Sequence, residues 1–80
     1  MIDLTQMKPG ETRRIVELQD GHGLVKRLES LGIRVGVTIT KKSSPLLRGP
    51  VIVQIGNTQI AIGFGMAKKI MVQLATETPK

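Results

Sequence analysis

Apolar and polar positions alternate most regularly in two short runs that a Gly-Asn dipeptide separates, Val51–Ile55 and Thr58–Ile62. Gly56 suits the first central position of a two-residue hairpin turn, because that position needs a positive φ, which glycine tolerates. If Ile55 pairs with Thr58, one face of the hairpin carries Val51, Val53, Ile55, Ile60 and Ile62. A slip of one residue would destroy this agreement. The pattern therefore predicts a β-hairpin in this register.

A different spacing, typical of a helix, runs through residues 22–31. Apolar side chains stand at positions 24, 25, 28 and 31, which fall on one helical face. Gly32 follows directly and can take the left-handed conformation that ends many helices, after which Ile33 can pack back on Leu28. We expect a short amphipathic helix with Leu31 in its apolar stripe and a Schellman-type end.

The remaining apolar positions predict further strands at 12–18, 37–41 and 70–74, with one helical turn at 66–69. Val16 and Leu18 alternate on one face of the first of these strands, and Ile15 breaks the pattern. About five short strands with one helix in 80 residues favour a mainly β protein, folded as a small SH3-like barrel with the helix at about 22–31 inserted. We expect one domain at 1–75 and a frayed tail at 76–80.

Composition excludes several kinds of chemistry. The chain has no cysteine, so disulfides, thiolate metal sites and cysteine nucleophiles are excluded. Its one histidine, His22, lies in a glycine-flanked segment, and its six acidic residues are scattered, so we expect no enzyme, no metal site and no cofactor. No apolar stretch approaches the length that spans a bilayer, which favours a cytoplasmic protein without membrane insertion.

The charge leaves the partner open. Twelve basic and six acidic residues give a net charge of +6, which nucleic acid, an acidic protein surface or anionic lipid could match. The basic residues stand in pairs, which we expect to be solvated: Arg13/Arg14, Lys26/Arg27, Lys41/Lys42 and Lys68/Lys69. Phe64 is the one aromatic residue, so the chain lacks the stacking platform of single-strand binders. A small basic nucleic-acid-binding barrel therefore remains an alternative that only the charge favours.

An ordered set of short motifs carries a resemblance to a known family. The motifs are Leu4…Met7-Lys8-Pro9-Gly10-Glu11, Leu28-Glu29-Ser30-Leu31-Gly32-Ile33-Arg34-Val35-Gly36, Gly49-Pro50-Val51, Gly56-Asn57-Thr58-Gln59-Ile60-Ala61-Ile62 and Met66-Ala67-Lys68-Lys69-Ile70-Met71-Val72. Together, over residues 4 to about 74, they resemble the FeoA family. Val35 departs from the family, which often has proline there, and so does Phe64, at a position that we expect to be polar in many relatives.

The resemblance implies an SH3-like barrel with an inserted helix and no catalytic residues. It also implies a cytoplasmic accessory protein of ferrous iron uptake, which docks on the cytosolic GTPase region of a FeoB-type transporter. Two segments combine apolar and basic residues as a docking surface would: Leu46, Leu47 and Arg48, and Phe64, Met66, Lys68 and Lys69. Either could instead pack into the core. A self-associating, metal-responsive regulatory module, and with it a weak homo-oligomer, is a further alternative.

Overall fold

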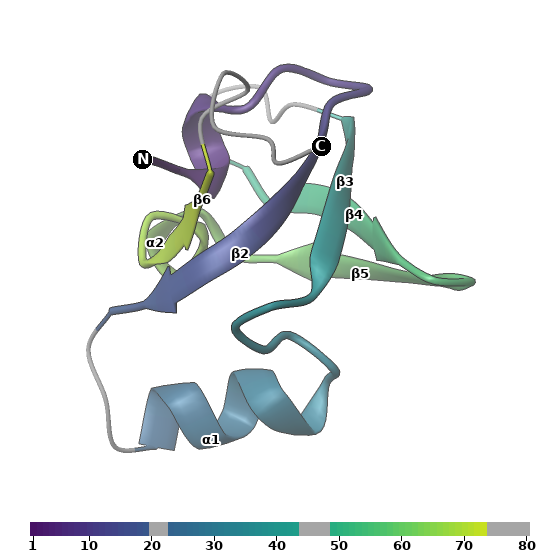
Figure 1. Ribbon diagram of the computed structural model, residues 1–80. Coiled ribbons are helices and arrows are strands. Elements are labelled where there is room, and N and C mark those ends of the chain that lie inside the picture. Colours follow the sequence, from purple (N-terminus) through teal and green to yellow (C-terminus); the bar gives the residue numbers. More distant parts are fainter. Residues whose placement is uncertain (20–22, 44–48, 74–80) are drawn as a thin grey trace.

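The chain folds as a six-stranded antiparallel sheet that curls around one core, as the computed structural model shows (Figure 1). The structure describes residues 1–19, 23–43 and 49–73. Its elements are β1 (Ile2–Asp3), the 3-10 helix η1 (Leu4–Gln6), β2 (Thr12–Leu18), α1 (Gly23–Ser30), β3 (Thr38–Ser43), β4 (Val51–Ile55), β5 (Thr58–Ile62), α2 (Phe64–Ala67) and β6 (Ile70–Val72). The strand order is β1-β6-β2-β3-β4-β5.

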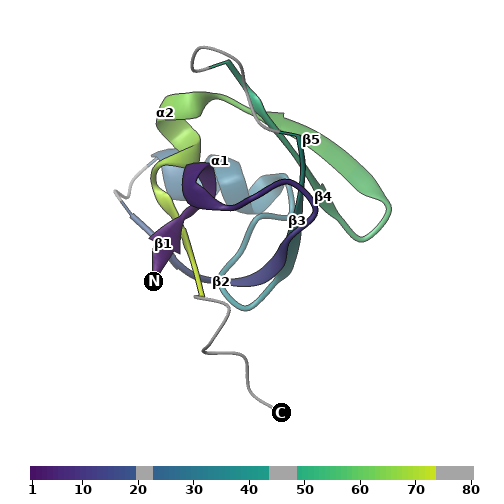
Figure 2. The ribbon, with the colours of Figure 1, turned by 90° about the horizontal axis from the view of Figure 1, so that it is seen from above.

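The curvature of the sheet produces a barrel with a helix at each end. Seen from above, the strands follow one another around a ring, which α2 continues between β5 and β1 (Figure 2). The helix η1 lies at one end of this barrel, and α1 lies at the opposite end (Figure 1). The core is aliphatic throughout: Leu4, Met7, Ile15, Leu28, Ile33, Ile39, Val51, Val53, Ile62, Ala67, Ile70 and Val72. This barrel confirms the predicted fold class.

The β4–β5 hairpin has the register that the apolar pattern predicts. Ile55 pairs with Thr58, Val53 with Ile60 and Val51 with Ile62. Gly56 has a φ of 61°, in the left-handed region. The prediction succeeded because the two determinants of register, the turn and the apolar face, both lie within the hairpin itself.

The predicted helix is also confirmed, at Gly23–Ser30, and so is the way it ends. Gly32 has a φ of 90°, and the amide of Ile33 donates to the carbonyl of Leu28 at 2.9 Å. Leu28 and Ile33 are both fully buried. Leu31, however, is 48% exposed, so its place in the apolar stripe is wrong. The helix has ended by residue 31, and Ile33 supplies the apolar contact.

The broken alternation in β2 marks a β-bulge. The pairing of β2 with β6 shifts register between Ile15, which faces Val72, and Glu17, which faces Met71. The extra residue is Val16, which is half-buried, whereas Ile15 lies in the core. A bulge places two residues opposite one and so shifts the alternation by one position. The alternation of Val16 and Leu18 on one face is therefore wrong.

The structure departs from the prediction in its details. The strand β1 and the helix η1 were not predicted, and β1 brings the strand count to six. The last strand ends at Val72 in the described residues, whereas Leu74, the domain end at 75 and the tail at 76–80 lie outside them. The helical turn α2 begins at Phe64 rather than at Met66, because the amide of Ala67 donates to the carbonyl of Gly63 at 2.9 Å and closes the turn earlier.

Candidate partner-binding surface

The segment from Phe64 to Lys69 brings one of the two predicted docking segments together on a short helix. The amide of Lys68 donates to the carbonyl of Phe64 at 3.1 Å, and that of Lys69 to the carbonyl of Met66 at 3.0 Å. The carbonyl of Lys69 in turn accepts from the amide of Gln19 at 2.8 Å. Two of these hydrogen bonds close the turn of α2, and the one from Gln19 joins its C-terminal end to the chain that follows β2.

The side chains of this segment divide between the core and the surface. Met66 is half-buried and packs against the core, as the alternative to a docking role predicts. Phe64 is half-buried as well, and the Lys68 ammonium lies 5.9 Å from the centroid of its ring, within cation–π range. Lys68 is exposed and Lys69 is half-buried. The α2 face, as we call Phe64, Lys68 and Lys69, therefore combines an aromatic ring that has one lysine over it with a second, half-buried lysine next in the sequence.

The other predicted segment, Leu46, Leu47 and Arg48, lies outside the described residues, and so does His22. The docking role of this segment therefore stays a prediction. Within the described ranges, no group of three or more His, Cys, Asp or Glu residues is placed to hold a metal ion. No helix in the described part of the chain is long and apolar enough to cross a membrane.

Two exposed apolar side chains lie near the end of α1, where no docking surface was predicted. Leu31 is 48% exposed and Val35 is 58% exposed. Arg34, also exposed, donates from Nε to the carbonyl of Glu29 at 3.4 Å. The sequence feature that could have indicated the exposure of Leu31 is Gly32, because this glycine ends α1 before Leu31 can join the buried face of the helix.

Lys41 is buried, which corrects the expectation that the basic pairs are solvated. Its side chain is 1% exposed, and its Nζ donates to three backbone carbonyls: Leu4 at 3.2 Å, Thr5 at 3.1 Å and Met7 at 2.7 Å. These three acceptors match the three N–H groups of an ammonium, each of which can donate one hydrogen bond. Burial lowers the pKa of Lys41, whereas the charges of Asp3 and Glu11 raise it. The ammonium fastens the N-terminal segment to β3.

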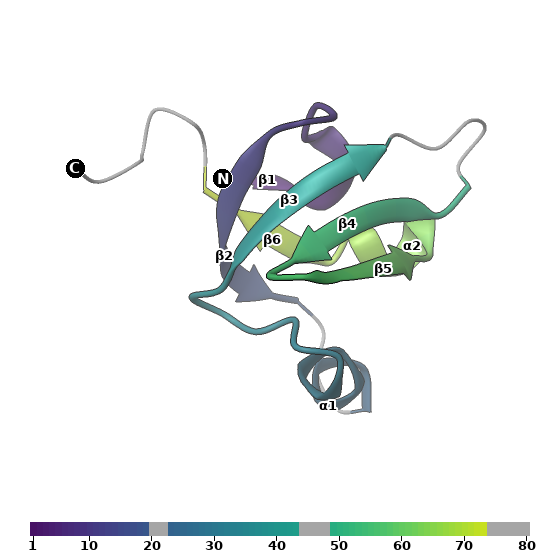
Figure 3. The ribbon, with the colours of Figure 1, turned by 90° about the vertical axis from the view of Figure 1, so that its right-hand side faces the viewer.

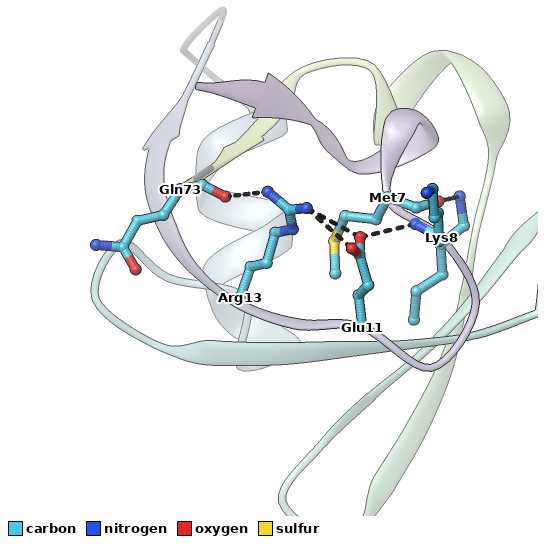
Figure 4. A network of polar contacts seen from close by, with 6 residues as sticks. Met7, Lys8, Glu11, Arg13 and Gln73 are labelled. Carbon is cyan, nitrogen blue, oxygen red and sulfur yellow. Dashed lines mark hydrogen bonds and ion pairs between the residues drawn. The ribbon is translucent and has the colours of Figure 1, made fainter. Parts of the chain in front are cut away.

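Arg13 is the second cation that the fold uses internally. Its guanidinium donates to both carboxylate oxygens of Glu11 at 3.1 and 3.0 Å and to the carbonyl of Gln73 at 2.7 Å (Figure 4). The Glu11 carboxylate also accepts from the amide of Lys8 at 2.9 Å. This backbone hydrogen bond and the guanidinium of Arg13 lower the pKa of Glu11. The network joins the turn before β2 to the chain after β6.

The sequence of residues 2–74 matches the FeoA domain family, which is nearly the whole chain. The chain belongs to the FeoA family. The resemblance carried by the short motifs is thereby confirmed, and with it the SH3-like barrel, since a FeoA relative of the same fold is described as an SH3 domain protein.

Relatives of this FeoA chain agree with it over almost their full length. A chain from Methanocaldococcus jannaschii, named as a candidate Fe(2+) transport protein A, is 38% identical over 73 residues, which cover 91% of this chain and 87% of the relative. A crystal structure of an iron uptake regulatory protein, FeoA, has a TM-score of 0.81 at 35% identity and covers 90% of this chain and 93% of its own. Zinc-complexed FeoA from Stenotrophomonas maltophilia has a TM-score of 0.79 at 25% identity, with 91% of each chain covered.

Proposed function

We propose that this chain is a non-catalytic, cytoplasmic accessory protein of ferrous iron uptake that docks on the cytosolic GTPase region of a FeoB-type transporter. The observation that supports the proposal most strongly is the family match over residues 2–74, together with relatives named for Fe(2+) transport and iron uptake. Because the match extends over residues 2–74 and not over one isolated motif, it supports a proposal in which the barrel as a unit is the binding module.

The α2 face is the docking surface that the geometry supports best. Binding interfaces combine an apolar centre, often aromatic, with a polar or charged rim. Phe64 begins α2, and Lys68 and Lys69 follow it directly, so the segment offers this combination. The hydrogen bond from the Gln19 amide to the Lys69 carbonyl holds the end of the segment in place. A preformed surface loses little conformational entropy when it binds. The net charge of +6 favours an acidic partner surface and would speed the encounter with it.

The direct test measures binding of this chain to the soluble GTPase domain of the FeoB-type transporter from the same source. We would immobilise the GTPase domain and measure the affinity in the nucleotide-free, GDP and GTP-analogue states, at low and physiological salt. The proposal predicts saturable binding in at least one nucleotide state, weakened by salt. Absence of binding in every state would contradict docking on the GTPase region.

A pair of charge reversals locates the interface. Lys68→Glu should weaken binding and flatten its salt dependence, because a charge at the rim of an interface acts mainly on the association rate. Lys26→Glu is the matched control, since Lys26 is equally an exposed lysine but lies on α1. If both reversals weaken binding equally, net charge and not the α2 face determines the affinity.

The segment Leu46, Leu47 and Arg48 is tested separately. Leu47→Asp should leave binding unchanged if the α2 face alone forms the interface. A loss of binding, in a variant whose far-UV circular dichroism matches that of the parent chain, would assign the interface to this segment instead.

A further inference from the structure

The two edges of the sheet differ greatly in length. One edge is β1, which has two residues, and the other is β5, which has five. In Figure 3 β5 is the outermost strand next to β4, and the hairpin that it forms with β4 projects beyond the barrel in Figures 1 and 2. A strand from another molecule could therefore pair with β5, whereas β1 is too short to pair with such a strand.

The register of the hairpin decides which backbone groups point outward. In a hairpin with a two-residue turn, the residues that flank the turn exchange hydrogen bonds, and every second pair after them does the same. Thr58, Ile60 and Ile62 therefore turn their N–H and C=O groups toward β4. Gln59 and Ala61 turn theirs to the outer edge, where no backbone hydrogen bond reaches them within the described part of the chain.

The β5 strand itself carries none of the sequence features by which proteins usually prevent edge pairing. Such features include a charged side chain, a proline or a bulge on the edge strand. β5 has the sequence Thr-Gln-Ile-Ala-Ile, and its pairing with β4 runs without a shift of register. No charged residue occurs from Gly49 to Ala67, although the chain carries 18 charged residues in all. Two copies can thus bring their β5 edges together without placing like charges next to each other, although each copy has a net charge of +6.

We propose that two copies of this chain pair through their β5 strands, antiparallel, about a twofold axis at Ile60. Gln59 of one copy then faces Ala61 of the other, and both residues are those whose backbone groups point outward. The symmetry repeats this pair, which gives four backbone hydrogen bonds. The inference concerns self-association and does not depend on docking to a transporter.

The geometry at the twofold axis is specific to one residue. Ile60 faces its own copy in a non-hydrogen-bonded antiparallel pair, in which the two Cα atoms lie about 4.5 Å apart. The two half-buried isoleucine side chains extend from the same face of the joined sheet and pack on each other. An edge of five residues makes a small interface, so the association is weak and depends on concentration.

A disulfide cross-link tests the register directly, because the chain has no cysteine of its own. Ile60→Cys should form a disulfide-linked dimer under mild oxidation, since the Cα separation lies within the range that a disulfide spans. Thr58→Cys is the control, because residue 58 is more exposed than residue 60. In the proposed dimer the two copies of residue 58 are offset by four residues along the strand direction, which places them about 13 Å apart. Equal cross-linking of both variants would overturn the proposed register.

Sedimentation of the unmodified chain over a wide concentration range tests the association itself. The average mass should rise with concentration from one chain toward two. Ala61→Lys should keep the chain monomeric, because a lysine on an edge strand prevents pairing. Thr38→Lys adds the same charge at an exposed position of β3, inside the sheet, and should leave the dimer intact.

Two results would overturn the proposal. One is a mass of one chain at every concentration, and the other is a dimer that Ala61→Lys does not weaken. Circular dichroism of each variant establishes that it is folded, so that a monomeric mass reports on the edge and not on unfolding.

Discussion

Lys41 shows at the scale of one residue how alternation can mislead about charge. The run 37–41 alternates, so Lys41 shares a face with Ile39, which lies in the core. The alternation therefore indicated that the Lys41 side chain is buried, whereas its charge favoured exposure to solvent. An ammonium can be buried when its N–H groups are all satisfied, and the carbonyls that do so here belong to η1 and the residue after it. Those partners lie more than thirty positions away in the sequence.

Replacing Lys41 with methionine should destabilise the fold by about 1–3 kcal/mol, because the carbonyls of Leu4, Thr5 and Met7 lose their charged donor. Methionine keeps an unbranched side chain that is one atom shorter than lysine, so packing changes little. Urea denaturation followed by circular dichroism measures the effect. Lys42→Met, at the exposed neighbouring position, should change the stability by less than about 0.5 kcal/mol. Equal effects of the two substitutions would contradict a role for the three hydrogen bonds.

Glu11 should make the stability sensitive to acid. Its pKa in the folded chain lies below the ordinary value of 4.5, so at pH values below about 4.5 the unfolded state binds more protons than the folded state. Its contribution to stability is complete above that pH and is lost as the pH falls through the folded pKa. Glu11→Gln should therefore be less stable than the parent chain at neutral pH, and the difference should shrink in acid.

The measurement for Glu11 is urea denaturation from pH 7 to pH 3 on the parent chain and the variant. Glu29→Gln is the control, because the exposed Glu29 carboxylate forms no hydrogen bond or ion pair within the described residues. A stability difference that stays constant with pH for Glu11→Gln would contradict a stabilising role for the charge of the Glu11 carboxylate.

At the scale of elements, local signals predicted structure well and long-range contacts did not. The β4–β5 hairpin and the end of α1 are determined by residues close in sequence, and both were predicted. The segments that form β1 and η1 are short, and their alternation of apolar and polar residues is weak. They are held by partners far along the chain, since β1 pairs with β6. The bulge in β2 appeared in the sequence as an irregular alternation, but only its pairing with β6 identifies it.

The docking surface was predictable only in part. The α2 segment combines apolar and basic residues in sequence, but the division of Phe64 and Met66 between surface and core depends on how the barrel closes. The exposure of Leu31 follows from the position at which α1 ends, which helical periodicity alone does not give.

The turn between α1 and β3 accepts a proline that this chain lacks. The amide of Val37 donates to the carbonyl of Arg34 at 3.1 Å, and Gly36 has a φ of 96°, which together are typical of a type II turn with Val35 at its second position. Proline is favoured there, and the amide of Val35 has no hydrogen bond that it would lose among the described residues. Val35→Pro should therefore stabilise the fold by about 0.4–1 kcal/mol, because it restricts the unfolded chain.

Val37→Pro is the matched control for this turn. It removes the amide that closes the turn and should therefore destabilise the fold. Thermal and urea denaturation of both variants measure the two effects. Destabilisation by Val35→Pro would show that the backbone of residue 35 does not match the φ of proline.

At the scale of the whole molecule, the net charge of +6 overstates how much positive charge faces solvent. Among the described residues, Lys41 is buried among carbonyls and Arg13 pairs with Glu11, so at least these two cations serve the fold itself. The β4–β5 hairpin and α2 carry no charge at all. Within the described residues, the exposed cations lie on β2, α1 and β3 and in the segments between elements, including Lys68 directly after α2, and do not follow one continuous strand or helix.

This distribution predicts weak and unspecific binding to nucleic acid. The affinity for nucleic acid increases with the number of phosphates that the protein contacts, and binding that depends on few contacts is lost as the salt concentration rises. Fluorescence anisotropy of a labelled single-stranded DNA should show binding at low salt and none that saturates at about 0.15 M ionic strength. Lys41→Met should leave the low-salt binding unchanged, because a buried ammonium cannot reach a phosphate, whereas Lys68→Glu should reduce it. Saturable binding at physiological salt, with a steep dependence on salt concentration, would instead favour the nucleic-acid alternative. It would mean that exposed cations from separate elements contact the phosphates of the same nucleic-acid strand.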